Sequence, residues 1–310
     1  SGLMCTLFGW RAVFVVPLVG GIVVAAAGVK LVQNVGERSN TTLDILSVVL
    51  LAAGITAFVY SVGEFSTNLI AGIVALFAAI VLLGLFAARQ LKLEHPVLNV
   101  RPMASVRFWP ACLLVVVSMM TTFSMSVLLP LYFEGAYGMT ALVAGLLILP
   151  AIACNAVTSI VGGRVMDARG AWPLLPVGFA LIAVGQTAIS MTAASMNIGL
   201  VVALTVVVYA GVGLVLSPSQ TAGLETLPAA EHPHGTALLN TWNMIAASFG
   251  PSLFIGLLSS SAATAGAAGV ATDVAQAIGF AAAVRVAAVI AVVGFVASLV
   301  YARRESHMSH

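Results

Sequence analysis

Nine long apolar segments follow one another along the chain, and they restrict its fold more than any other feature. A helix of about 17–25 apolar residues crosses about 30 Å of hydrocarbon, which is the thickness of a bilayer core. Alternation of apolar and polar residues with period two is missing, which argues against a membrane β-barrel. The sequence therefore predicts an all-α integral membrane protein, a polytopic bundle of about nine transmembrane helices. The segments are Ala12–Val32, Ile45–Ser61, Leu69–Ala88, Trp109–Phe133, Ala141–Val161, Leu174–Ala194, Ile198–Leu216, Ala237–Leu258 and Ala277–Tyr301.

The composition excludes several classes of protein. Of the 310 residues, 61% are hydrophobic and 7% are charged, whereas a soluble domain has about 25% charged residues. No basic patch is interleaved with aromatic residues, so nucleic acid is not an expected partner. The cysteines Cys5, Cys112 and Cys154 show no metal or redox spacing. No P-loop or catalytic cluster is visible, so we expect neither an enzyme nor a metal or other cofactor.

Lysine and arginine residues alternate between the intervals that separate the segments. Ten of the 12 lie in one set of intervals and two lie in the other. Loops rich in lysine and arginine stay in the cytoplasm, so the pattern predicts a multi-pass protein of the cell membrane. The N-terminus of the chain would lie outside and the C-terminus in the cytoplasm. The larger set is Lys30, Arg38, Arg89, Lys92, Arg101, Arg107, Arg164, Arg169, Arg303 and Arg304, and the smaller set is Arg11 and Arg285.

The stretch GGRVMDARGAW gathers three charges between the fifth and sixth segments. We expect a short cytoplasmic turn in which Gly163 lets two helices approach and Gly170 frees the backbone. Asp167 would cap the next helix or pair with Arg164 or Arg169. A plain charged loop that obeys the positive-inside rule is the alternative interpretation.

This stretch resembles the loop signature of the major facilitator superfamily, G-x-L-A-D-R-x-G-R-K, which latches neighbouring helices at the cytoplasmic face. Gly163, Asp167 and Gly170 match it, and Arg164 or Arg169 would replace its usual cations. Five further stretches resemble the fourteen-helix drug:proton antiporters of the EmrB/QacA type. They are GWRAVFVVPLVGG (Gly9–Gly21), LDILSVVLLAAG (Leu43–Gly54), HPVLNVRPMASVRF (His95–Phe108), LPLYFEGAYGMTALVAGLLILP (Leu129–Pro150) and GTALLNTWNMIAASFG (Gly235–Gly250).

The resemblance implies that the nine segments correspond to helices six to fourteen of that fold, without its first five helices. Residues 1–33 would form the last helix of the first bundle, and residues 34–91 would form two extra linker helices. Residues 92–108 would be a cytoplasmic connector, and residues 109–310 would form the second six-helix bundle. The implied activity is proton-coupled export of drugs or other small lipophilic or cationic molecules by alternating access.

Polar residues within apolar spans are candidates for a cavity or a substrate site, because an unpartnered polar group is costly there. Glu134 is either an entrance carboxylate or an exposed loop acid, and it stands where the family often has glutamine. Four amides would either bond neighbouring helices or line the cavity, and an adjacent tryptophan would contact a lipophilic substrate or anchor at the interface. These residues are Asn155, Gln186, Asn240, Asn243 and Trp242.

Two further interpretations remain open at this point. The chain could be a facilitator or importer of one metabolite, or a truncated membrane fragment that does not transport. The expected partners of an exporter are the lipid bilayer, a small-molecule substrate and protons, with the proton gradient as energy source and any membrane-fusion partner protein unidentified. Asp44, at the start of the second segment, is expected to cap its helix.

Overall fold

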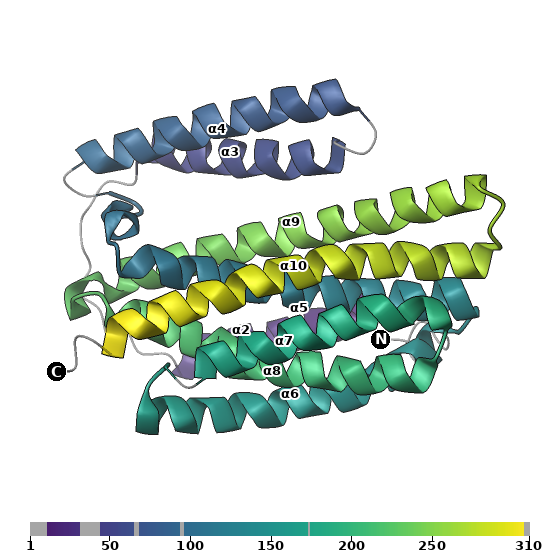
Figure 1. Ribbon diagram of the computed structural model, residues 1–310. Helices are drawn as coiled ribbons and strands as arrows, with labels where there is room; N and C mark the ends of the chain where they lie inside the picture. The colour runs from purple at the N-terminus through teal and green to yellow at the C-terminus, as the bar shows by residue number, and fades with distance from the viewer. Residues whose placement is uncertain (1–10, 32–43, 65–67, 94–95, 173, 307–310) are drawn as a thin grey trace.

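The computed structural model consists of helices and their connections (Figure 1). It describes residues 11–31, 44–64, 68–93, 96–172 and 174–306, and these ranges contain no β-strand. The long helices are α2 (Ala12–Leu31), α3 (Ile45–Glu64), α4 (Leu69–Lys92), α5 (Phe108–Tyr137), α6 (Ala141–Arg169), α7 (Leu174–Thr192), α8 (Ile198–Glu225), α9 (His232–Ala267) and α10 (Thr272–Ser306). Three short 3₁₀ turns are η1 (Arg101–Ala104), η2 (Ala193–Ser195) and η3 (Ala229–Glu231).

The predicted membrane fold is confirmed. Each apolar segment coincides with one long helix, and within the described residues 8 helices are long and apolar enough to cross a membrane. The first segment forms α2, whose described apolar part, Pro17–Gly28, is shorter than a full span. The stretch before α2 and the basic residue Arg38 lie outside the described residues.

Helices α5 to α10 pack around one core. Helix α5 contacts α8, α9 and α10, and α8 lies between α6 and α7. The large side chains at the centre are fully buried and come from four of these helices. Each helix bonds its own backbone N–H and C=O groups, so these groups need no water inside the bundle. These buried side chains are Tyr132, Phe133, Phe179, Phe254 and Phe280.

Glycines let α8 approach both of its neighbours closely, as small residues do in membrane bundles. A Cβ added at Gly211 would lie 2.5 Å from the carbonyl oxygen of Gly178 in α7. A Cβ added at Gly213 would lie 2.7 Å from the carbonyl oxygen of Asn155 in α6. Backbone contact therefore holds α6, α8 and α7 side by side.

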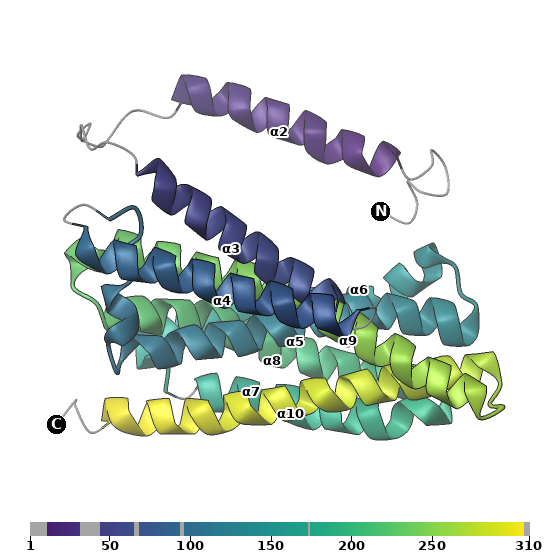
Figure 2. The same cartoon turned by 90° about the horizontal axis from the view of Figure 1, so that it is seen from above.

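Helices α3 and α4 form a hairpin on one side of this bundle (Figure 2). The hairpin contacts α9, where the rings of Phe58 and Phe249 stack with their centroids 5.9 Å apart. Its outer face exposes large apolar side chains such as Ile70, Val74 and Phe77. Helix α2 lies apart from the hairpin in Figure 2, and its described side chains are exposed along nearly all of its length.

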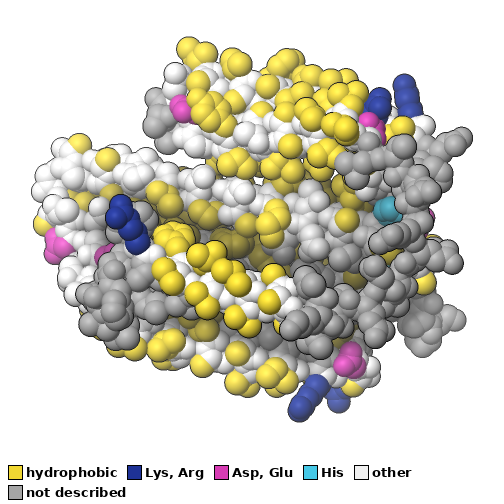
Figure 3. All heavy atoms as spheres, turned by 180° about the vertical axis from the view of Figure 1, so that it is seen from behind, with side chains coloured by type: hydrophobic (Ala, Val, Ile, Leu, Met, Phe, Trp, Pro, Cys, Tyr) yellow, Lys and Arg dark blue, Asp and Glu magenta, His cyan; other side chains and the backbone are white. Residues whose placement is uncertain are grey.

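Helix ends that carry arginine or lysine lie at one end of the bundle. The end of α4, the start of α5, the end of α6 and the C-terminus lie together at the left of Figure 1. Figure 3 shows apolar side chains spread along the middle of the visible face, with charged side chains toward its two ends. A surface of this kind suits a lipid bilayer, in which apolar side chains are solvated by hydrocarbon.

Helices α9 and α10 reach past their neighbours at the opposite end. The ring of Phe280 stacks on Tyr132, and the hydroxyl of Tyr132 donates to the carbonyl oxygen of Ala193 just after α7. Phe280 is therefore level with the end of α7, so the part of α10 before it projects beyond that level.

Candidate functional site

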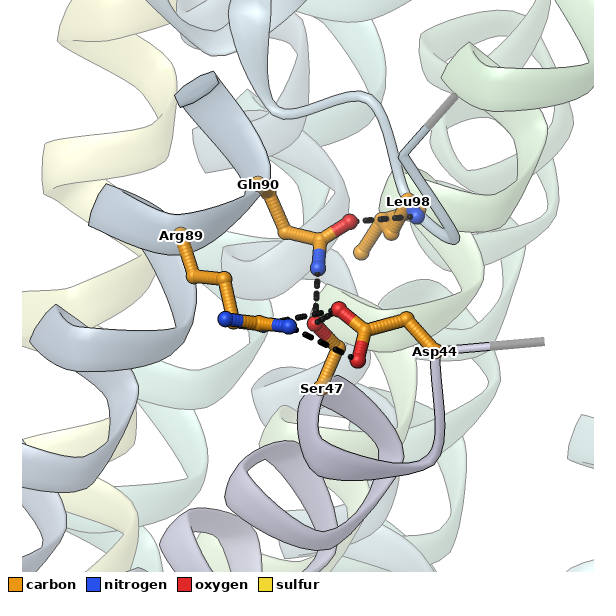
Figure 4. Close-up of polar contacts among 5 residues, drawn as sticks. All are labelled: Asp44, Ser47, Arg89, Gln90 and Leu98. Atoms are coloured by element: carbon orange, nitrogen blue, oxygen red, sulfur yellow. Dashed lines mark hydrogen bonds and ion pairs between the residues drawn. The ribbon is translucent and has the colours of Figure 1, made fainter. Parts of the chain in front are cut away.

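A partly buried network of polar side chains joins the start of α3 to the end of α4 (Figure 4). The Arg89 guanidinium donates from Nε to Oδ2 of Asp44 at 2.8 Å and from a terminal nitrogen to Oδ1 at 3.1 Å. This two-point geometry fits the planar fork of arginine to both carboxylate oxygens. The side chain of Asp44 is 16% exposed and that of Arg89 is 40% exposed.

The network continues inward through Ser47 and Gln90, both of which are buried. The Ser47 hydroxyl donates to Asp44 Oδ2 at 2.6 Å and accepts from Gln90 Nε2 at 2.6 Å. The Gln90 Oε1 atom accepts from the backbone N–H of Leu98 at 3.1 Å. These bonds satisfy polar groups that would be costly to bury alone, and they fix the connector to α4.

Hydrogen bonds to its charged form lower the pKa of Asp44. The Arg89 side chain lowers the pKa most, and the Ser47 hydroxyl comes next. Burial acts in the opposite direction, and the backbone N–H of Ser47 adds a smaller lowering. The expected helix-capping role is consistent with that backbone bond. The ion pair with Arg89, 45 residues away in sequence, was not predicted. Only the position of both residues at helix ends could have suggested it.

The connector between α4 and α5 also contacts the bundle. The indole N–H of Trp242 in α9 donates to the sulfur of Met103 in η1 at 3.4 Å. A second, smaller apolar cluster includes Leu98 of the connector, Phe86 of α4 and Phe108 of α5. The hairpin, the connector and the bundle are therefore joined by polar and apolar contacts at one end of the molecule.

The GGRVMDARGAW motif forms the end of α6 rather than a free turn. Helix α6 continues to Arg169, so Arg164 and Asp167 are helical and Asp167 does not cap the next helix. All three charged side chains are exposed, and no ion pair joins them to the described part of the chain. The latch stays a prediction.

Of the two motif glycines, Gly170 has the special backbone conformation that was expected, whereas Gly163 does not make the expected close approach. Gly170 ends α6 with φ 73° and ψ −175°, a conformation that glycine adopts far more readily than other residues. A Cβ at Gly163 would meet no atom within 4 Å, whereas one at the preceding Gly162 would lie 3.3 Å from the Gly213 carbonyl oxygen in α8. The close helix approach expected of Gly163 is therefore made by Gly162.

Two of the predicted amides lie between helices. The Asn155 side chain donates from Nδ2 to the carbonyl oxygen of Tyr209 at 3.1 Å and so bonds α6 to α8. Gln186 in α7 is fully buried, and neither its Nε2 nor its Oε1 atom has a hydrogen-bond partner in the described structure. Asn155 therefore bonds two neighbouring helices, which is one of the two interpretations given for these amides.

The other predicted residues lie on surfaces. Glu134 is exposed in the last turn of α5, and Asn240 is exposed on α9. Asn243 is partly buried one turn further along α9. Trp242 belongs to the second apolar cluster, against Met103. The structure therefore does not bring the six candidates into one constellation.

One face of α9 carries a stripe of uncharged polar side chains. Successive steps of four or three residues follow a line that winds slowly around a helix, and along this line hydroxyl or amide groups occupy five of seven positions. The exposed outer face of α4, by contrast, presents leucine, isoleucine, valine and phenylalanine. We call this face the α9 polar stripe, and it consists of Thr236, Asn240, Met244, Ser248, Ser252, Ile255 and Ser259.

These features define a class, a polytopic helical membrane protein without a cluster of metal-ligating residues among those described. The sequence profile of the Major Facilitator Superfamily matches residues 1–251. The chain belongs to this superfamily of membrane transporters. Its membership favours a transporter over an enzyme.

Curated relatives with similar sequences are bacterial. The lincomycin resistance protein LmrB of Listeria monocytogenes is 30% identical over 84% of this chain and 56% of its own length. The uncharacterized MFS-type transporter YcnB of Bacillus subtilis is 32% identical over 96% of this chain and 63% of its own length. A riboflavin transporter of Clostridioides difficile, RibZ, is 23% identical over 82% of this chain. The chain spans a little over half the length of these relatives.

Proposed function

We propose that the chain is part of an exporter of small molecules that belongs to the fourteen-helix drug:proton antiporter branch. The proposal rests on the resemblance of its motifs and on its similarity to LmrB of Listeria monocytogenes, which is a lincomycin resistance protein. In this assignment α2 is the last helix of the first bundle, α3 and α4 are the linker pair, and α5 to α10 are the second bundle. Transport proceeds by rocking of the two bundles around a central cavity.

The single observation that carries the proposal is the α9 polar stripe. Four members of the stripe are hydroxyls that donate to carbonyl oxygens within α9, namely Thr236, Ser248, Ser252 and Ser259. Hydrocarbon cannot replace the partners of an exposed amide in the same way. Asn240 is exposed on this stripe and offers both donors and acceptors. The exposed amide of Asn240 therefore favours a polar route at this point of α9, and Asn240 with its neighbour Asn243 is placed to bind polar groups of a substrate.

The contacts at the Asp44–Arg89 end support the proposal that the α3–α4 hairpin moves with the second bundle during rocking. Gln90 holds the connector at Leu98, and Trp242 holds it at Met103. The GGRVMDARGAW motif at the end of α6 lies on the same side and would latch the first bundle in one of the two end states. Differential contacts of this kind are what allow one state to be favoured over the other.

The proposed coupling uses protons that enter from outside, with the N-terminus of the chain outside and the C-terminus in the cytoplasm. Glu134, exposed near the outer end of α5, is the entrance carboxylate of this proposal. Replacing Glu134 by glutamine would lower proton-driven export without unfolding the bundle. If the variant exported as fast as the original protein, Glu134 would have no role in the proton pathway.

An efflux assay tests the function. Cells that express the complete gene are loaded with lincomycin or with a cationic dye, and efflux is followed before and after the proton gradient is collapsed. The proposal expects gradient-dependent efflux that falls when Asn240 is replaced by leucine, with Val289 on the exposed face of α10 replaced by leucine as control. Gradient-independent uptake of one metabolite would instead favour an importer, and no movement of any compound would favour a fragment that does not transport.

The orientation is tested separately by labelling single cysteines from the two faces of intact cells. A cysteine at Arg169 is expected to react only from the cytoplasm, and one at Asp273 only from outside. Both are exposed in the structure. Labelling of Arg169 from outside would overturn the proposed orientation and leave the fold unaffected.

A further inference from the structure

Arg285 is a charged residue on the apolar outer face of α10. Its side chain is exposed, and every other exposed residue of the helix from there to Tyr301 is a valine. Residues 286–302 carry no charge. Valine suits contact with lipid tails, whereas a charged side chain is costly there unless it reaches a polar partner. The exposed valines are Val289, Val292, Val293, Val296 and Val300.

Helical spacing places Arg285 on the side of α10 that points away from the bundle. Val289 and Val292 follow it at four and seven residues, so the three side chains share one face. Gly294 follows at nine residues, which is two and a half turns, and therefore lies on the opposite side. An added Cβ at Gly294 would be 2.6 Å from Phe179 of α7, so that opposite side faces the core.

Acidic side chains of the neighbouring helices lie too far away to pair with Arg285. On α10 and the helices packed against it, the described acidic residues at this end are Glu134 and Asp273. Asp273 is twelve residues before Arg285, or about 18 Å along the axis. Glu134 adjoins Gly135, where an added Cβ would lie 3.4 Å from Gln276. Gln276 is nine residues before Arg285, or about 13.5 Å along the axis.

The outer face of α10 also lies away from the first bundle. Figure 2 shows α10 along one edge of the molecule and α2 along the opposite edge. In the assignment proposed above, α2 belongs to the first bundle, so that bundle lies on the far side from α10. The exposed valines and Arg285 therefore face the lipid.

The depth of Arg285 in the bilayer follows from two distances along α10. Phe280 is level with the end of α7, and Arg285 lies five residues, or about 7.5 Å, further along the helix. Arg303, the next charged residue, lies about 27 Å beyond Arg285. The hydrocarbon core is about 30 Å thick. Arg285 therefore sits just inside the hydrocarbon boundary nearest the connection between α9 and α10.

The direction of the side chain brings its charge to that boundary. Side chains of a helix lean toward its N-terminus, and the N-terminus of α10 is at the connection with α9. The long stem of Arg285 can therefore lie along the apolar face while the guanidinium reaches the level of the lipid head groups.

We propose that Arg285 binds the phosphate group of a phospholipid whose acyl chains lie along the valines of α10. The planar guanidinium can donate two parallel hydrogen bonds to phosphate oxygens. Charge and depth both match, because the head groups of phospholipids begin at the edge of the hydrocarbon core. In the proposed orientation the lipid belongs to the outer leaflet. Both this choice of leaflet and the uncovered face of α10 rest on the proposed function.

Native mass spectrometry tests the site on the protein of the complete gene. The purified protein is titrated with phosphatidylglycerol in detergent, and the bound lipids are counted from the added mass. Arg285→Leu is expected to retain one lipid fewer than the original at the same concentration, and the neutral polar variant Arg285→Gln should do the same. Val289→Leu, one turn away on the same face, should bind as the original does. Equal lipid counts for the original and both Arg285 variants would overturn the proposal.

Two further ligands distinguish a phospholipid from other occupants. A galactolipid with the same acyl chains but no phosphate should not fill the site. Inorganic phosphate should displace no more phosphatidylglycerol than chloride of the same ionic strength, because it has no chains to contact the valines. Binding of the galactolipid through Arg285, or specific displacement by inorganic phosphate, would refute a phospholipid site.

The same spectra report on a second copy of the chain. A dimer of the original that becomes a monomer in Arg285→Leu would show that another copy covers this face, and it would refute the lipid. The lipid counts require no transport, so a protein that exports nothing could still confirm the site. Failure of the site would likewise leave the proposed export standing.

Discussion

Replacing Gly213 by alanine measures how far the backbone contact between α6 and α8 holds the bundle together. The new Cβ would lie 2.7 Å from the carbonyl oxygen of Asn155 and 3.0 Å from the backbone nitrogen of Ser159, whereas ordinary contact begins at 3.4 Å. The helices must therefore separate by about 0.7 Å, since 3.4 minus 2.7 is 0.7. The hydroxyl of Thr158 lies nearer still and can rotate away, but the two backbone atoms cannot.

The separation also affects a hydrogen bond. The bond from Asn155 Nδ2 to the Tyr209 carbonyl oxygen is 3.1 Å long, and adding about 0.7 Å takes it beyond hydrogen-bonding range. Overpacking of this kind costs about 1–3 kcal/mol, and exchanging a helical glycine for alanine returns about 0.5–1 kcal/mol. We expect a net loss of about 1–2 kcal/mol of unfolding free energy.

The matched control lies on the neighbouring helix. Gly163→Ala introduces the same methyl group into α6 where no atom lies within 4 Å, so it should gain about 0.5–1 kcal/mol from helix propensity alone. Both variants are unfolded with SDS in mixed micelles and followed by circular dichroism. Equal stability of the two variants, or a larger loss for Gly163→Ala, would refute the packing argument.

Three further predictions concern single residues. Because Arg89 lowers the pKa of Asp44, the bonded carboxylate stabilises the fold above its usual pKa of about 4 and loses that effect only at lower pH. Asp44→Asn should therefore melt earlier than the original chain at every pH from about 4 to 8, and a difference that vanishes near neutral pH would contradict this. Asn155→Ala should cost about 0.6–1 kcal/mol in SDS unfolding by losing its bond to Tyr209, and an unchanged midpoint would count against that bond. Gly170→Ala should cost about 1–3 kcal/mol in the same assay because φ is 73° there, and a neutral result would show that the end of α6 relaxes.

Hydropathy identified the spans because it reports contact with hydrocarbon. For the same reason it underestimated the lengths of the helices. The expected segment Ala141–Val161 is part of α6, which continues to Arg169, and Ala237–Leu258 is part of α9, which runs from His232 to Ala267. Backbone hydrogen bonding extends a helix past the apolar region into the interface. The charges of GGRVMDARGAW were therefore placed in a turn when they belong to a helix.

The candidate sites were predicted less well, because a single sequence does not tell which helices face each other. Gly162 and Gly163 are adjacent, and only the position of α8 decides which of them makes the close approach. Asp44 and Arg89 are far apart in sequence and meet because α3 and α4 are antiparallel. The amide of Gln186 could be recognised as buried and polar, but its lack of a partner depends on the neighbouring side chains.

The projection of α9 and α10 past α7 has a practical consequence for imaging. A 36-residue helix measures about 54 Å at 1.5 Å per residue, which exceeds the hydrocarbon thickness of about 30 Å. The two helices are joined by a tight connection around Gly269, at the end of the bundle away from the Asp44–Arg89 network. A rigid helical tag spliced into this tip would continue both helices without a flexible hinge. It would give a particle of 31.6 kDa the added mass needed for alignment in electron micrographs.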